Sequence, residues 1–135
     1  MTIDNLIMHI CTNDTGEQKM TTYAALNRKY LRELNDLLAK HDLPQASEKL
    51  WGAFVDAVKP VAESRGQMLG THRSVAQFIL MLNKEYPELR LHDAFRHAEG
   101  LHTNFFEDQL PEESVLLSAD VVRQAIERLR LKIPF

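Results

Sequence analysis

The residues of this sequence that are best suited to chemistry are gathered in one stretch, Ala94 to Leu110. This stretch, AFRHAEGLHTNFFEDQL, carries the guanidinium of Arg96, the imidazoles of His97 and His102, and the carboxylate of Glu99. A guanidinium stays charged at neutral pH, whereas an imidazole readily exchanges a proton there. Such a pair suits attack on a phosphodiester, with Arg96 neutralising phosphate charge and His102 acting as base or acid. We therefore predict that any site of this protein lies here.

Neighbouring polar residues supply candidate helpers for that chemistry. His97 follows Arg96 directly and offers a second polar participant. Asn104 and Glu107 are three residues apart, and either side chain could cap the helix or orient His102. Arg73, which follows the loop predicted before the third helix, could extend a phosphate-binding patch. The predicted catalytic residues are Arg96, His97 and His102, and the predicted substrate-binding residues are Asn104, Arg73 and Glu107.

The spacing of Arg96 and His102 leaves a structural alternative open. Six steps on an undistorted helix place the two side chains about 120° apart, so they can share the edge of a cleft without stacking. The alternative is that Arg96 is a surface charge and that His102 is a hydrogen-bonded, half-buried side chain. Phe105 and Phe106 are expected to lie in the hydrophobic core rather than to form platforms for nucleobases.

Glu99 and His102 form a Glu-x-x-His pair, which is half of the ligand set of a di-iron or di-manganese site in a helical bundle. Such a site needs a second copy of the pair, and the chain contains no second Glu-x-x-His. The sequence also lacks a Gly-rich phosphate loop, and its single cysteine, Cys11, stands far from the key stretch. We therefore expect neither a metal ion nor another cofactor.

Length and composition indicate one ordinary globular domain. The chain has 135 residues, of which 44% are hydrophobic and 26% charged, enough to bury a core. A formal net charge of -3 argues against a surface coated with charge for binding nucleic acid, although a small cleft could still meet RNA. We see no membrane-spanning run and no secretory signal. One cysteine excludes an intramolecular disulfide, so we expect a cytoplasmic protein with no membrane partner.

Apolar residues recur at helical spacing through most of the chain. Caps, prolines and glycines set the expected ends of each helix. Thr21 or Thr22 is the expected cap of the first helix, and Gly66 is expected to end the second. The expected helices run from Thr21 to His41, from Pro44 to Arg65, from Thr71 or Ser74 to Tyr86, from Ala94 to Leu110 and from Ser118 to about Leu131.

No convincing strand pattern and no internal repeat accompany these helices. Their short loops favour antiparallel packing of neighbours. The sequence therefore predicts an all-α, antiparallel bundle of four to five helices, formed as a single domain by residues 19–135. Residues 1–18 are predicted to be an N-terminal arm, whose apolar stripe fits a helix or a short strand equally well.

Three segments together resemble a known family. They are ASEKLWGAFVDAVKPVAESRG in the second helix, THRS in the turn that follows, and LHTNFFED at the end of the key stretch. The resemblance is to the paREP-type proteins, a largely archaeal branch of the HEPN superfamily (higher eukaryotes and prokaryotes nucleotide-binding). It covers roughly Tyr30 to Leu129 and implies an HEPN-like helical bundle that commonly dimerises.

Catalytic members of that superfamily are metal-independent ribonucleases, many of them toxins or defence effectors. Their motif is an arginine, usually followed by a polar residue, and then a histidine after four to six intervening residues. Arg96, His97 and His102 match it. The resemblance therefore implies a homodimer that cleaves RNA, with a cognate antitoxin protein as a further expected partner. The alternative is a non-catalytic module that binds a nucleotide or a protein in the same cleft.

Overall fold

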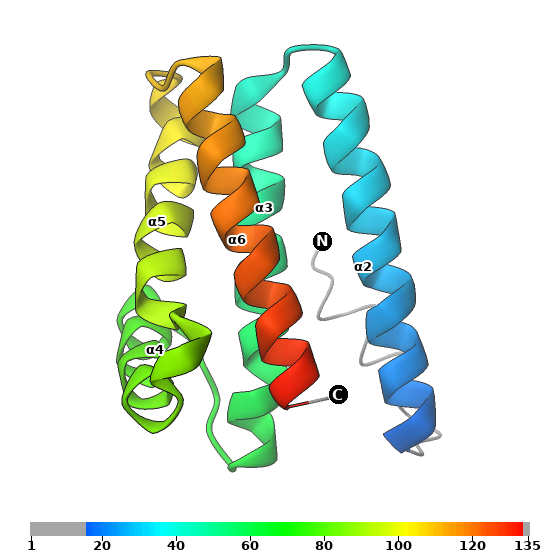
Figure 1. The fold of residues 1–135 in the computed structure, drawn as a ribbon, viewed down its shortest axis with the longest axis vertical. Helices are drawn as coiled ribbons and strands as arrows, with labels where there is room; N and C mark the ends of the chain where they lie inside the picture. Colours follow the sequence, from blue (N-terminus) through cyan, green and yellow to red (C-terminus); the bar gives the residue numbers. More distant parts are fainter. Residues whose placement is uncertain (1–15, 134–135) are drawn as a thin grey trace.

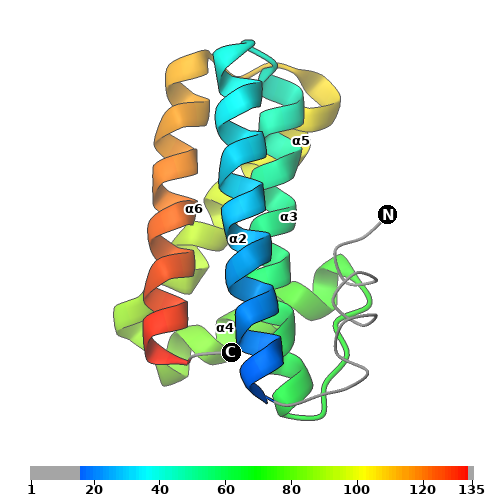
Figure 2. The ribbon, with the colours of Figure 1, turned by 90° about the vertical axis from the view of Figure 1, so that its right-hand side faces the viewer.

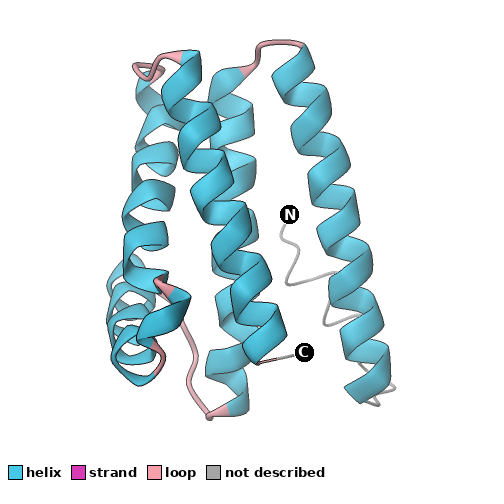
Figure 3. Cartoon of the chain, viewed as in Figure 1, coloured by secondary structure: helices cyan, strands magenta, loops and turns pink. Residues whose placement is uncertain are grey.

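The computed structural model describes residues 16–133, and it describes side chains from residue 28 onward. This part of the chain forms five α-helices and one short 3-10 helix, and it contains no strand (Figure 3). The predicted all-α bundle is therefore confirmed. The elements are α2 (Gly16–Ala39), α3 (Leu43–Ser64), α4 (His72–Glu85), η2 (Pro87–Leu89), α5 (Leu91–Glu107) and α6 (Glu112–Lys132).

Four long helices run alongside one another, and neighbours in sequence point in opposite directions (Figures 1 and 2). The helix α3 lies in the middle and packs against α2, α5 and α6. The shorter α4 packs against α5 at the end of the bundle where α3 finishes (Figure 1). None of the helices in this described part is long and apolar enough to cross a membrane.

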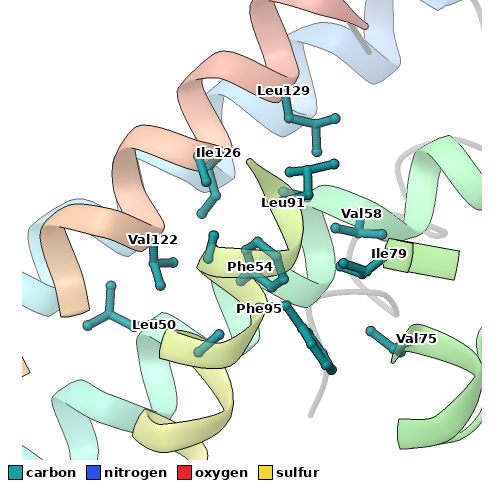
Figure 4. Close-up of a cluster of buried hydrophobic side chains, with 14 of the residues drawn as sticks. Leu50, Phe54, Val58, Val75, Ile79, Leu91, Phe95, Val122, Ile126 and Leu129 are labelled. Atoms are coloured by element: carbon teal, nitrogen blue, oxygen red, sulfur yellow. The ribbon is translucent and has the colours of Figure 1, made fainter. Parts of the chain in front are cut away.

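The hydrophobic core fills the space between α3, α5 and α6 (Figure 4). Leu50, Phe54 and Val58 repeat at every fourth position of α3, so they share one face, and each is at most 2% exposed. Ile79 of α4 lies beside Val58 at the edge of this cluster. Burying such a side chain contributes about 1.5–3 kcal/mol, so this cluster dominates the stability of the bundle. Its partners on α5 and α6 are Leu91, Phe95, Val122, Ile126 and Leu129.

The residues predicted to end α3 and to begin α4 are confirmed by the structure. Thr71 and Ser74 cap the start of α4 reciprocally, each side chain bonding the backbone N–H of the other. At the end of α3, Gly66 takes a positive φ of 74°, a conformation that favours glycine. The N–H of Gln67 then bonds the carbonyl of Ala62, which satisfies one of the last orphan carbonyls of α3.

The predicted start of the first helix is wrong. The helix α2 begins at Gly16, so Thr21 and Thr22 lie inside it and do not cap it. Residues 16–18, which we had expected in the N-terminal arm, are part of α2. The remainder of that arm, including Cys11, lies outside the described residues.

The predicted boundaries of the last two helices also need correction. The helix α5 begins at Leu91, where the side chain of Asn83 accepts a hydrogen bond from the N–H of His92. The helix α6 begins at Glu112 instead of Ser118, because Pro111 occupies its N-cap position and two glutamates fill its first turn. The hydroxyl of Ser118 hydrogen-bonds the ring of His97 and does not cap a helix.

Asn104 holds the turn between α5 and α6. Helix α5 ends at Glu107 because Asp108 adopts a left-handed conformation with a φ of 47°. The side-chain oxygen of Asn104 accepts hydrogen bonds from the N–H groups of Gln109 and Leu110, both at 2.8 Å. Its amide nitrogen donates to the hydroxyl of Ser47 at 3.1 Å. Asn104 is fully buried and is therefore a structural anchor between α3, α5 and the turn.

Replacing Asn104 with alanine should lower the free energy of unfolding by about 2–4 kcal/mol, because two backbone N–H groups and one hydroxyl lose a buried partner. Urea denaturation followed by circular dichroism measures this change. The control is Thr103→Ala, an exposed neighbour on the same helix, whose effect should stay within about 0.5 kcal/mol. Equal stabilities for the two variants would contradict this role of Asn104.

Candidate functional site

The polar residues of α5 meet α3 and α4 around Trp51, the single tryptophan of the chain. Two imidazoles stack on its indole. The ring of His102 lies 4.6 Å from it between centroids and the ring of His72 lies 5.2 Å away. The two imidazole centroids are 6.3 Å apart. We call these three side chains, together with Glu48 and Glu99, which bind the two imidazoles, the His–Trp–His cluster.

Each imidazole of the His–Trp–His cluster is held by a carboxylate. The Nδ1 atom of His102 lies 2.9 Å from the carboxylate of Glu48, and the Nε2 atom of His72 lies 2.9 Å from that of Glu99. A carboxylate accepts, so the bonded nitrogen carries the proton. In a neutral imidazole the other nitrogen then keeps its lone pair, which makes it a potential base. Both rings are part-exposed, at 32% for His102 and 48% for His72.

Three helices position these groups. Glu48 and Trp51 are three residues apart, on one face of α3, and Glu99 and His102 have the same spacing on α5. His72 is the first residue of α4, so the N-cap at Thr71 fixes the backbone position from which the imidazole projects. Below the cluster lies Phe95, which is 3% exposed and contacts the rings of Trp51 and His72. The cluster is therefore built on the hydrophobic core.

Arg96 joins this cluster through a carboxylate. Its Nε atom lies 3.6 Å from Glu99, whose other oxygen is bound to His72. The guanidinium is 70% exposed, so it remains accessible to an anion in solution. Arg96, Glu99 and His102 follow one another at intervals of three residues and form a diagonal ridge on the surface of α5.

The other predicted site residues lie apart from the His–Trp–His cluster or at its edge. His97 points to α6, where its Nδ1 atom lies 3.0 Å from the hydroxyl of Ser118. Asn104 is buried and occupied by the turn after α5. Arg73 directly follows His72 and is exposed, and Glu107 is exposed as the last residue of α5. Of the three predicted catalytic residues, His102 is a member of the cluster, Arg96 reaches it through Glu99, and His97 lies apart.

Phe106 does not lie in the core, contrary to our expectation. Its side chain is 71% exposed, whereas Phe105 beside it is part-buried. The reason is its position on α5: four residues beyond His102, it lies on the same face as that surface imidazole. The rings of Phe106 and His102 meet edge to face at 5.5 Å. This exposed ring therefore extends the aromatic surface that begins at Trp51.

Sequence reasoning missed Glu48, Trp51 and His72. They come from the two preceding helices, α3 and α4, and the separations in sequence are 54 residues between Glu48 and His102 and 27 between His72 and Glu99. The sequence did contain one indication of these residues, because Trp51 is the single tryptophan of the chain and stands three positions after Glu48. His72 also stood in the THRS turn, directly after the capping threonine.

A separate cavity of about 440 Å³ lies between α2, α3 and α6. Its lining is mostly apolar and contains no histidine. Lys49 at its edge is bound to Glu33 at 2.6 Å, and this hydrogen bond holds the pKa of Glu33 below its ordinary value. Arg123 is likewise bound to Asp120 at 2.8 Å. The lining also carries Tyr30 and Glu127, but it offers no imidazole to exchange a proton near neutral pH, so we place the candidate site at the His–Trp–His cluster.

The His–Trp–His cluster has a spectroscopic reporter of its own, since Trp51 is the only tryptophan. Rings stacked on the indole shield it from solvent. We expect acrylamide, at one fixed pH, to quench Trp51 emission more strongly in the double variant His72→Ala, His102→Ala than in the wild type, because both rings that cover the indole are lost. Quenching should be unchanged in His41→Ala, which removes an exposed histidine paired with Glu112. Equal quenching of the wild type and the double variant would contradict the stacking.

Comparisons with known proteins give one match. The model of the archaeal PaREP1/PaREP8 family matches residues 22–126. This range contains every residue of the His–Trp–His cluster, together with Arg96 and Phe106. No curated protein and no solved structure matches the chain.

Proposed function

The chain belongs to the archaeal PaREP1/PaREP8 family, and we propose that it is an endoribonuclease that needs no metal ion. One observation carries this proposal. Two imidazoles, each bound to its own carboxylate, are stacked on one indole at the protein surface. RNA cleavage by its own 2′-hydroxyl needs one group to remove a proton and another to donate one. Two imidazoles 6.3 Å apart can contact one phosphate from two sides.

In the proposed reaction, the Nε2 atom of His102 takes the proton from a ribose 2′-hydroxyl. The 2′-oxygen attacks phosphorus, and the bond from phosphorus to the 5′-oxygen breaks. Protonated His72 donates a proton from Nδ1 to that leaving oxygen. The products are a 2′,3′-cyclic phosphate and a 5′-hydroxyl end. Glu48 and Glu99 fix the orientation of the two rings and which ring nitrogen carries the proton.

Arg96 has a different role in this proposal. Negative charge builds up on the phosphate oxygens as the 2′-oxygen attacks, and a guanidinium nearby stabilises it. The exposure of Arg96 lets it reach such a phosphate. Its contact with Glu99 at 3.6 Å is long, so a phosphate can compete for the same N–H groups. Two carboxylates in the cluster limit affinity for RNA, which favours short contacts with one or two nucleotides over a long basic track.

The decisive test is cleavage of a mixed RNA in EDTA buffer. We expect His102→Gln and His72→Gln each to lower kcat/KM by about 10²–10⁴-fold, because each removes one proton-transfer group. Arg96→Ala should lower it by about 10²-fold through lost stabilisation of phosphate charge. Gel electrophoresis and detection of the cyclic phosphate measure the loss.

The matched control for this test is His41→Gln. His41 also pairs with a carboxylate, that of Glu112 at 2.7 Å, but it lies outside the His–Trp–His cluster. Its removal should leave cleavage unchanged within about twofold, since it is exposed and away from the site. Equal losses in all histidine variants would point to a folding effect. Saturable nucleotide binding without cleavage by the wild-type protein would favour the non-catalytic module.

Homodimerisation, with a cognate antitoxin as a further partner, is part of the same proposal. A second copy would bring a second Arg96 to the same RNA, so that two guanidiniums could contact its phosphates although each chain carries a formal net charge of -3. Analytical ultracentrifugation at micromolar concentration should give twice the mass of one chain. A monomer mass throughout that range would contradict the dimer and leave the chemistry of the cluster to be tested separately.

A further inference from the structure

Phe106 is exposed in a way that the fold itself does not require. Its side chain is 71% exposed, and it is the one aromatic residue among the large hydrophobic side chains that lie open to solvent between residues 28 and 133. Its ring nevertheless has a defined place. It meets His102 at 5.5 Å and Phe105 at 4.9 Å, both nearly edge to face. Two ring contacts therefore hold an aromatic surface beside the imidazole that we propose as the base.

The charges along α5 differ between its two ends. Arg96 stands six residues before His102, about 9 Å along the helix axis, and Phe106 stands four residues after it, about 6 Å along. Glu107 and Asp108 follow Phe106 directly. Their carboxylates repel a phosphate at this end, whereas the guanidinium of Arg96 attracts one at the other. The end of α5 at Phe106 therefore suits an uncharged planar group.

We propose that Phe106 is a stacking platform for one nucleobase of a single-stranded RNA, and that this base places its ribose at His102. This inference rests on the proposed ribonuclease function and adds a substrate-positioning residue to it. Aromatic side chains stack on any base, so the contact is tolerant of sequence. It requires an unpaired base, because bases inside a duplex are stacked on one another and their faces are closed.

The test separates binding from cleavage. The binding probe is a single-stranded RNA hexanucleotide with 2′-O-methyl groups, which lacks the 2′-hydroxyl and is not cleaved by this chemistry. Fluorescence anisotropy should show that Phe106→Ala raises its Kd about tenfold, since one base-stacking contact is lost. Phe106→Tyr and Phe106→Trp should restore the wild-type Kd. A duplex of the same sequence should bind at least about tenfold more weakly than the single strand.

The matched control is Leu117→Ala, which removes another large apolar side chain that is 67% exposed, on α6. It should leave the Kd unchanged. With cleavable RNA, Phe106→Ala should raise KM about tenfold and change kcat by less than about threefold, because it positions the substrate and moves no proton.

The outcomes distinguish this inference from the proposed function. A Kd that is equal for the wild type and Phe106→Ala overturns the stacking role, even where the wild-type protein cleaves RNA. Lack of binding of the single strand by the wild-type protein also overturns it. Loss of binding in Phe106→Ala, with rescue by the aromatic variants, supports the stacking role even where the wild-type protein cleaves no RNA, and in that case the ribonuclease proposal alone fails.

Discussion

Burial of α3 is the constraint on which the rest of this structure depends. The helix packs against α2, α5 and α6, and it also touches α4. Ala46, Phe54, Val58 and Ala62 on it are completely buried. Small residues among these let neighbouring helices approach closely. One face of α3 remains open to polar groups, and Glu48 and Trp51 share it. The location of the candidate site is thus a consequence of how the core is packed.

Local signals in the sequence were enough to predict most of the helices but not all of their ends. The start predicted at Thr71 for α4 and the end predicted at Gly66 for α3 are correct. Capping by a side chain and a positive φ depend on only a few adjacent residues. Ser118 misled the prediction, since its hydroxyl is bound to His97 on another helix. The first turn of α5 is bound by Asn83, nine residues before His92. Such tertiary partners leave no trace in a pattern of apolar residues.

The candidate site was predicted only in the part that lies on one helix. Arg96 and His102 could be picked out because guanidinium and imidazole stand close together in the sequence. Glu48, which orients the ring of His102, and His72, which is the second imidazole, come from α3 and α4. His97 follows Arg96 in the sequence but points toward α6, because successive residues on a helix face directions about 100° apart. Proximity in sequence is therefore a poor guide to proximity across a bundle.

The buried hydrogen bond between Asn104 and Ser47 has a consequence for alignment. These are the two fully buried polar residues among the described side chains. Ser47 directly precedes Glu48 in the sequence, and Asn104 comes two residues after His102. An interface of apolar side chains alone tolerates sliding of one helix along another. A slip of one turn, about 5.4 Å, would leave the Asn104 amide without a partner and would separate His102 from Glu48. One polar pair in the core thus fixes the axial register of α5 on α3, and with it which carboxylate faces which imidazole.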